Sequence, residues 1–139
     1  MASTSVSRVV PASPQQVWNL IGGFDALPDW LPYIPESTAL EGGRIRRLTN
    51  PDGDAIVERL VSFDEAGRHY SYAILEAPFP VTGYLSTLRV HPVAGRDDVA
   101  EVQWSGRFTP DGVTDAEAED LFAGIYREGL DALHQALSV

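Results

Sequence analysis

The longest regular pattern of apolar positions lies near the C-terminus. Between residues 115 and 137, apolar side chains recur at intervals of three and four, the spacing of one face of an α-helix. Thr114 and Glu117 form a capping box where this segment begins. The spacing predicts a helix about 35 Å long over 115–137. Its apolar stripe, which must pack against another element, consists of Ala118, Leu121, Phe122, Ile125, Tyr126, Leu130, Leu133 and Leu137.

The middle of the chain alternates instead between apolar and polar positions, which is the period of a β-strand. Turn-forming residues at 50–53 and 95–98 separate the runs. A weaker alternation precedes them near the N-terminus. The pattern predicts seven strands, at 4–10, 36–41, 44–49, 54–63, 68–76, 83–91 and 99–108.

The segment between the first two predicted strands favours two short helices. Residues 13–16 form a capping box with proline at the first helical position, and the glycines at 22–23 end that helix. Residues 24–35 are apolar and rich in proline, which prevents a long helix there. We expect Asp25 to cap a second short helix that ends near Leu31.

This order of elements predicts one α+β domain over residues 1–139. A curved antiparallel sheet of about seven strands wraps around the long C-terminal helix, with two short helices between strands one and two. A sheet that curves around one helix leaves a space between them, and such a space is the natural place for a ligand.

Composition narrows the possible chemistry. Ten Arg, no Lys and twenty acidic residues give a net charge of −10, which argues against nucleic acids and anionic membrane surfaces as partners. Without Lys or Cys, no side chain can form a Schiff base or a thiolate site. No apolar run reaches the ~20 residues of a membrane span, so we expect a cytoplasmic protein without membrane insertion.

No cofactor or metal site is expected from the motifs. His69, His91 and His134 lack the spacing of metal ligands, and neither a phosphate loop nor a dinucleotide-binding glycine pattern occurs. We interpret the three histidines as structural or solvated side chains.

The element order resembles the START-like helix-grip superfamily, also called SRPBCC, and within it the bacterial polyketide cyclase/dehydratase-like branch. More distant similarity connects the chain to plant abscisic-acid receptors and birch-pollen-allergen relatives. The local matches are Val-Glu-Arg-Leu at 57–60 with Asp64, Tyr-Leu-Ser-Thr-Leu at 84–88, Asp111-Gly112, Leu121-Phe122, Tyr126 and Leu130.

The resemblance implies a hydrophobic pocket with Glu58, Tyr84 and Ser86 facing inward and the C-terminal helix as its roof. The receptors hold their ligand's carboxylate with a pocket lysine, for which this chain has Glu36 at the matching position. Residues 77–81 replace the receptors' latch, and residues 50–53 form a plain tight turn instead of their longer gate loop. Reception of abscisic acid is therefore not expected.

Glu58 is the strongest candidate for a catalytic residue, and its orientation is open. Its own face of the predicted strand carries Ile56, Leu60 and Ser62, whereas the opposite face carries Val57, Arg59, Val61 and Phe63. Apolar content alone favours burial of the second face and leaves Glu58 in solvent. The resemblance implies the reverse orientation, in which burial would raise the pKa of Glu58 and suit it to acid–base chemistry or ligand anchoring.

The remaining pocket candidates are mostly aromatic, and each can also be ordinary core packing. Tyr84 is a second catalytic candidate, because a tyrosine hydroxyl facing a cavity can polarise a ligand carbonyl. An apolar rim of Trp30, Leu31, Tyr33, Phe79 and Val81 either frames the pocket entrance or packs beneath the sheet. The predicted ligand-binding set is Glu58, Tyr72, Ile74, Phe79, Tyr84, Ser86, Trp104, Phe122, Tyr126 and Leu130.

Three functions remain open at this point. The first is binding of a small hydrophobic molecule, either aromatic, polyketide-like or lipid-like, in the cavity. The second is a cofactor-independent cyclase or dehydratase in which Glu58 shuttles a proton and Tyr72, Tyr84 or Ser86 orients a carbonyl. The third is a protein-interaction module that uses the 30–34 rim and has no cavity. The sequence leaves open whether the protein is a monomer or a homodimer.

Overall fold

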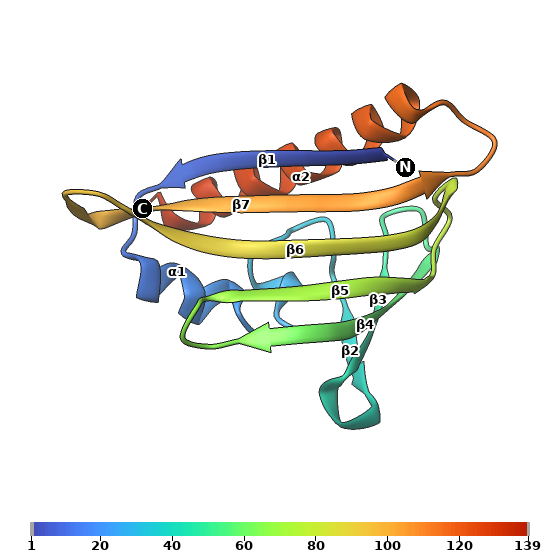
Figure 1. Cartoon of the computed structure of the whole chain (residues 1–139). Helices are drawn as coiled ribbons and strands as arrows, with labels where there is room; N and C mark the ends of the chain where they lie inside the picture. The colour runs from blue at the N-terminus through green and yellow to red at the C-terminus, as the bar shows by residue number, and fades with distance from the viewer. Residues whose placement is uncertain (1, 139) are drawn as a thin grey trace.

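The computed structural model describes residues 2–138 and has the α+β helix-grip architecture (Figure 1). One antiparallel sheet has the strand order β1-β7-β6-β5-β4-β3-β2. Its strands are β1 (Ala2–Val10), β2 (Ser37–Leu40), β3 (Ile45–Thr49), β4 (Ala55–Asp64), β5 (His69–Glu76), β6 (Val81–Val93) and β7 (Arg96–Pro110). The predicted fold class and all seven strands are confirmed.

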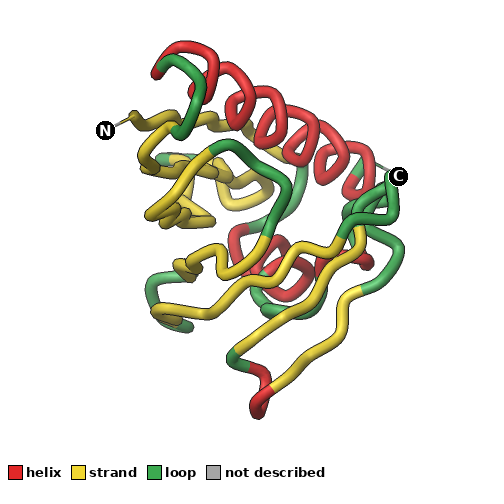
Figure 2. Tube along the Cα trace, turned by 90° about the vertical axis from the view of Figure 1, so that its right-hand side faces the viewer, coloured by secondary structure: helices red, strands yellow, loops and turns green. Residues whose placement is uncertain are grey.

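Helix α2 (Asp115–Leu137) has the bounds that the sequence predicts. The Thr114 hydroxyl accepts a hydrogen bond from the Glu117 N–H, and the Glu117 carboxylate accepts one from the Thr114 N–H. The helix crosses one face of the sheet beside β1 and β7, and the sheet curves away beneath it (Figure 2). The buried stripe of α2 therefore forms one wall of the interior and the inner face of the sheet forms the other.

The segment between β1 and β2 covers the remaining open side of the interior. Helix α1 (Pro14–Ile21) has the expected capping box at Ser13. The second short helix is only a 3-10 turn, η1 (Leu27–Asp29), with Ala26 at its N-cap, so the expected cap at Asp25 is wrong. The prolines explain the difference, because their fixed geometry leaves room for one tight turn and no full α-helix. A further 3-10 turn, η2 (Glu41–Gly43), joins β2 to β3.

Strands β3 and β4 form a hairpin whose register positions the candidate site. Pairing around the turn at residues 50–53 puts Arg46 directly opposite Glu58. Both side chains are buried on the inner face, whereas Val61 remains about half exposed. A register shift between Leu60 and Ser62 turns Phe63 to the same face as its cross-strand partner Tyr70. The apolar-content interpretation of β4 is therefore wrong. The ring of Phe63 packs against Trp18 of α1 with ring centres 5.6 Å apart, so Phe63 and Glu58 share one face although strict alternation puts them on opposite faces.

Among residues 2–138, no helix is both long and apolar enough to span a membrane.

Candidate ligand pocket

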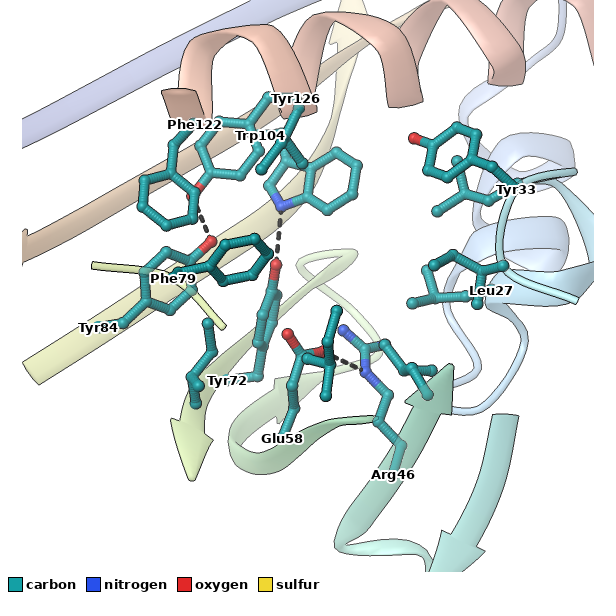
Figure 3. Close-up of a pocket in the computed structure, with 16 residues that line it drawn as sticks. Leu27, Tyr33, Arg46, Glu58, Tyr72, Phe79, Tyr84, Trp104, Phe122 and Tyr126 are labelled. Atoms are coloured by element: carbon teal, nitrogen blue, oxygen red, sulfur yellow. Dashed lines mark hydrogen bonds and ion pairs between the residues drawn. The ribbon is translucent and has the colours of Figure 1, made fainter. Parts of the chain in front are cut away.

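A small pocket of about 70 Å³ lies between the inner face of the sheet and helix α2 (Figure 3). Its lining is predominantly apolar and draws on β3 to β7, on α2 and on the connector that follows α1. The lining residues are Leu27, Leu31, Tyr33, Ile34, Arg46, Leu48, Ile56, Glu58, Tyr72, Ile74, Phe79, Tyr84, Trp104, Phe122, Ile125 and Tyr126.

An ion pair forms the charged part of this lining. The Nε of Arg46 donates to Oε1 of Glu58 over 2.7 Å, and the two side chains are only 1% and 8% exposed. Nη1 of Arg46 also donates to the Phe24 carbonyl oxygen over 2.7 Å and to the Tyr70 hydroxyl over 3.2 Å. Among the described residues, Oε2 of Glu58 and Nη2 of Arg46 have no hydrogen-bond partner. Both groups therefore keep capacity for a molecule in the pocket.

Aromatic rings surround the guanidinium of Arg46. Its Cζ lies 4.1 Å from the ring centre of Phe24, 4.7 Å from that of Tyr72 and 5.6 Å from that of Tyr70. The negative faces of such rings attract a cation, and the attraction is stronger where water is excluded. These contacts fix the position of the guanidinium and orient its bonds toward Glu58.

Burial decides the pKa of Glu58, whereas neighbouring groups decide that of Arg46. Desolvation raises the pKa of Glu58 above its usual range, and the positive charge of Arg46 opposes that rise. The pKa of Arg46 is also raised, because Tyr70, Glu58 and Tyr72 outweigh the desolvation of its charge. Arg46 stays protonated throughout the physiological range, while Glu58 is a carboxyl whose charge depends on its partner.

A second, uncharged cluster forms the opposite part of the lining. Nε1 of Trp104 donates to the Tyr72 hydroxyl over 3.1 Å and to the Ser86 hydroxyl over 3.2 Å. The Ser86 hydroxyl donates to the Ser105 carbonyl over 2.7 Å, and the Tyr84 and Tyr126 hydroxyls are hydrogen-bonded to each other. Burial raises the pKa of Tyr126 to about 12 and that of Tyr72 and Tyr84 well above the ordinary value. These hydroxyls stay protonated and satisfy one another.

Two glycines allow this aromatic cluster to pack closely. A Cβ at Gly129 of α2 would lie 2.5 Å from Cζ3 of Trp104, and a Cβ at Gly106 of β7 would collide with the Tyr126 hydroxyl. The indole of Trp104 stacks on the Tyr126 ring, with centres 5.1 Å apart. Because glycine has no side chain, α2 and β7 can lie close together with the rings of Trp104 and Tyr126 between them.

The whole chain matches one protein family. Residues 1–138 fit the family described as polyketide cyclase/dehydrase and lipid transport. The chain belongs to this family. The resemblance to START-like helix-grip proteins is thereby confirmed, whereas no curated protein matches the sequence.

Several solved structures superpose on nearly the whole chain. The protein XoxI from Bacillus cereus is 56% identical, with 99% of this chain and 96% of that chain covered and a TM-score of 0.95. An uncharacterized protein from Bacillus thuringiensis is 53% identical, with 98% of each chain covered and a TM-score of 0.95. An aromatase/cyclase from a Streptomyces species is 18% identical, covering 97% of this chain and 90% of that one with a TM-score of 0.74. At that identity the likeness concerns the fold.

Most of the residues predicted to bind a ligand lie in the pocket lining of this family member. The two exceptions are Ser86 and Leu130, which are buried outside it. The Ser86 hydroxyl accepts a hydrogen bond from Nε1 of Trp104 and donates its proton to the Ser105 carbonyl. It therefore has no proton left to orient the carbonyl of a ligand. The eight predicted residues in the lining are Glu58, Tyr72, Ile74, Phe79, Tyr84, Trp104, Phe122 and Tyr126.

Sequence reasoning missed Arg46, the partner of Glu58. The hairpin register offered a signal, because residues equally distant from the turn at 50–53 face each other. The resemblance to the receptors directed attention to Glu36 instead, and Glu36 is exposed outside the pocket. The cation of this pocket is therefore Arg46 on β3, and the carboxylate is Glu58 on the paired strand β4.

The apolar rim divides between core and pocket. Leu31, Tyr33 and Phe79 line the pocket, whereas Trp30 is 2% exposed and packs against Trp104 with ring centres 5.8 Å apart. Of the 30–34 rim, Trp30, Leu31 and Ile34 are buried and Pro32 is exposed. The pocket contradicts the filled core that the third hypothesis, an interaction module, requires.

Beyond Phe79 lies a larger surface hollow of about 350 Å³ that shares Ile74, Phe79 and Tyr84 with the pocket. Phe79 belongs to the short connector between β5 and β6, is half-buried, and meets Phe122 edge-on with ring centres 5.3 Å apart. Val81 lines this outer hollow and not the pocket. Phe79 thus lies, with Ile74 and Tyr84, between the pocket and the outer hollow.

Within residues 2–138, no group of three or more His, Cys, Asp or Glu side chains is arranged to hold a metal ion. His69 is half-buried near Asp64, His91 meets Gln103, and His134 lies on the last turn of α2.

Proposed function

We propose that this protein binds a small aromatic or polyketide-like molecule in the pocket, with an oxygen of that molecule held by Arg46 and Glu58. The apolar lining contacts the rings of the ligand, and the ion pair binds the polar group of the ligand. Nη2 of Arg46 donates to a carbonyl or hydroxyl oxygen, and Oε2 of Glu58 accepts from a hydroxyl. The family description and the aromatase/cyclase of the same fold support a ligand of this class.

The buried Arg46–Glu58 pair carries the proposal. Removing two charges from water costs free energy that an ion pair often does not recover, so a well-packed apolar pair would serve stability as well or better. Here the pair lies in an otherwise apolar pocket, and each partner keeps an unpartnered polar atom. Fixed donors and acceptors in an apolar pocket determine the orientation of a ligand.

The size of the pocket indicates that binding opens it. About 70 Å³ is half the volume of an engineered apolar cavity of about 150 Å³ that holds benzene. The adjacent hollow beyond Phe79 supplies the missing space when that half-buried ring turns aside. We therefore expect ligands of two fused rings to bind with displacement of Phe79.

Binding of 2-naphthol and of naphthalene by isothermal titration tests this proposal, because the two probes differ by a single hydroxyl. We expect the wild type to bind 2-naphthol about tenfold more tightly, the equivalent of one hydrogen bond to a charged group. The double variant R46M/E58M should lose this preference and bind both probes alike. Arg47→Met changes the exposed neighbour on the same strand and should leave the preference intact.

Equal affinity for both probes in the wild type would contradict the role of the ion pair. Binding of neither probe would contradict the pocket itself as the site for aromatic molecules of this size.

A cyclase-type reaction is the second candidate, and the environment of Glu58 favours it. A carboxyl with a raised pKa beside an apolar pocket suits proton transfer. In an intramolecular aldol condensation, Glu58 would take a proton from a carbon between two carbonyls. That carbon would attack a ketone carbon, and Arg46 would stabilise the resulting alkoxide, which takes the proton back from Glu58. Glu58 would then remove the second proton from the attacking carbon and pass it to the leaving hydroxyl, so that water departs and a ring with a new C=C bond remains. Tyr84 remains a candidate for orienting the carbonyl, although its hydroxyl is shared with Tyr126.

Turnover of a linear poly-β-ketone thioester, followed by mass spectrometry, tests the reaction. A cyclase requires that Glu58→Gln abolish the cyclised, dehydrated product while 2-naphthol still binds. A binding protein without this reaction would give no protein-dependent product, and Glu58→Gln would then change affinity alone.

A further inference from the structure

The hydroxyl of Tyr33 is a buried polar group of the pocket that the ion pair and the aromatic cluster leave unused. Tyr33 lies after η1, and its side chain reaches toward α2. Its oxygen is buried and has no hydrogen-bond partner among residues 2–138. Buried hydroxyls are nearly always hydrogen-bonded, since leaving one without a partner costs about 1–3 kcal/mol.

The position of this oxygen can be located in the pocket. It lies 3.3 Å from the point where a Cβ at Gly129 would stand, so it is close to the backbone of α2 beside Trp104. Arg46 and Glu58 belong to the β3–β4 hairpin, and Figure 3 shows them at a different end of the pocket from the Tyr33 oxygen. Two separate polar ends thus border one apolar space.

The protonation state of Tyr33 suits a donor. Burial, and secondarily the negative charge of Glu128, raises the pKa of Tyr33 to about 12. The phenol therefore keeps its proton at neutral pH and can both donate and accept a hydrogen bond.

We propose that the Tyr33 hydroxyl is a second polar anchor, which selects aromatic ligands with oxygen substituents at both ends over ligands with one. This inference rests on the proposed function and names its ligand class more closely. The ligand would replace the missing partner of Tyr33, so the free energy lost in burying that hydroxyl is recovered only in the complex.

The test compares 2-naphthol with dihydroxynaphthalenes whose hydroxyls lie on different rings, such as the 2,6 and 2,7 isomers. Isothermal titration should show that the wild type binds at least one of these diols about tenfold more tightly than 2-naphthol. Tyr33→Phe should remove this advantage, so that the preferred diol binds no more tightly than 2-naphthol. The melting temperature of Tyr33→Phe should not fall, because no hydrogen bond within the protein is lost.

Ser37→Ala is a matched control. The Ser37 hydroxyl is also buried without a partner among the described residues, but it lies outside the pocket. Its removal should therefore change neither the affinity for 2-naphthol nor the affinity for the diols.

Three results would overturn the anchor: no preference for any diol in the wild type, equal weakening of both ligand types by Tyr33→Phe, or the same loss in Ser37→Ala. If 2-naphthol binds and the diol preference is missing, only the anchor fails. If the wild type binds none of these molecules, the proposed function fails with it.

Discussion

Two polar regions border the same pocket, and they are built on opposite principles. The Arg46–Glu58 pair on β3 and β4 is charged, encircled by rings, and retains unpartnered atoms. The cluster around Trp104 on β5, β6, β7 and α2 is neutral, and its hydroxyls and indole satisfy one another. Both are buried to a similar degree, so burial alone does not distinguish them.

The difference separates stability from recognition. A neutral cluster whose members satisfy one another stabilises the contact between helix and sheet and has little left to offer a ligand. A buried ion pair contributes weakly to stability relative to an apolar pair, but it keeps a directed charge in the pocket. We therefore assign the neutral cluster to the framework and the charged pair to the ligand.

The largest effect is expected when one member of the charged pair is removed. Arg46→Met leaves the Glu58 carboxylate and the Phe24 carbonyl buried without a donor, which should lower the free energy of unfolding by about 3–5 kcal/mol. R46M/E58M should recover most of that loss, because two apolar chains replace the pair. Urea denaturation measures both.

If the double variant were as unstable as Arg46→Met, the pair would be part of the framework, and the contrast between the regions would disappear. Arg47→Met, on the exposed side of the same strand, controls for the loss of one arginine.

Alkaline pH should act on the neutral cluster and on Tyr33, whose pKa is also raised to about 12. The pKa of Tyr126 is raised to about 12, and the pKa values of Tyr72 and Tyr84 are raised as well. Each tyrosine ionises near pH 10 when unfolded, so its contribution is complete below that pH and is lost as the pH rises through the folded pKa. The free energy of unfolding should fall by up to about 1.4 kcal/mol per pH unit for each tyrosine in this window.

Denaturation at several values between about pH 9 and pH 11, together with tyrosinate absorbance, measures this loss. Tyr126→Phe should reduce the loss of unfolding free energy per pH unit. Arg46 stays charged over the same range and so does not contribute to the pH dependence. If the free energy of unfolding fell equally steeply with pH in Tyr126→Phe, the titrating groups would lie elsewhere.

A smaller effect is expected at the glycines of α2. Gly129→Ala would force a methyl group against Trp104, and such overpacking should cost about 1–3 kcal/mol. Gly124 lies on the same helix with open space around it, so Gly124→Ala should raise stability by up to about 1 kcal/mol. Thermal unfolding of the two variants should thus shift in opposite directions; shifts in the same direction would mean that Trp104 is not held against the helix.

The sequence predicted the elements well because their signals are local. The spacing of apolar residues over 115–137 and the turn at 50–53 determine the bounds of α2 and of the β3–β4 hairpin without knowledge of tertiary contacts. The orientation of β4 was not recoverable from apolar content, because the register shift after Leu60 puts Phe63 on the same face as Glu58, where its ring packs against Trp18. A charged residue such as Arg46 counts as solvent-exposed in that reasoning until its partner across the hairpin is considered.

The smallest effect on stability, and the one that probes how a ligand reaches the charged region, is expected at Phe79. Phe79→Ala removes a half-buried ring and its contact with Phe122, which should lower the free energy of unfolding by about 1 kcal/mol, well below the cost of emptying a core site. The same change joins the pocket to the outer hollow, so 2-naphthol should bind faster in stopped-flow fluorescence while its preference over naphthalene persists. Val81→Ala alters the hollow alone and should leave the association rate unchanged. The preference for 2-naphthol over naphthalene depends on Arg46 and Glu58, whereas the association rate depends on Phe79. If Phe79→Ala bound 2-naphthol faster but lost the preference, the ligand would be bound in the hollow and not at the ion pair.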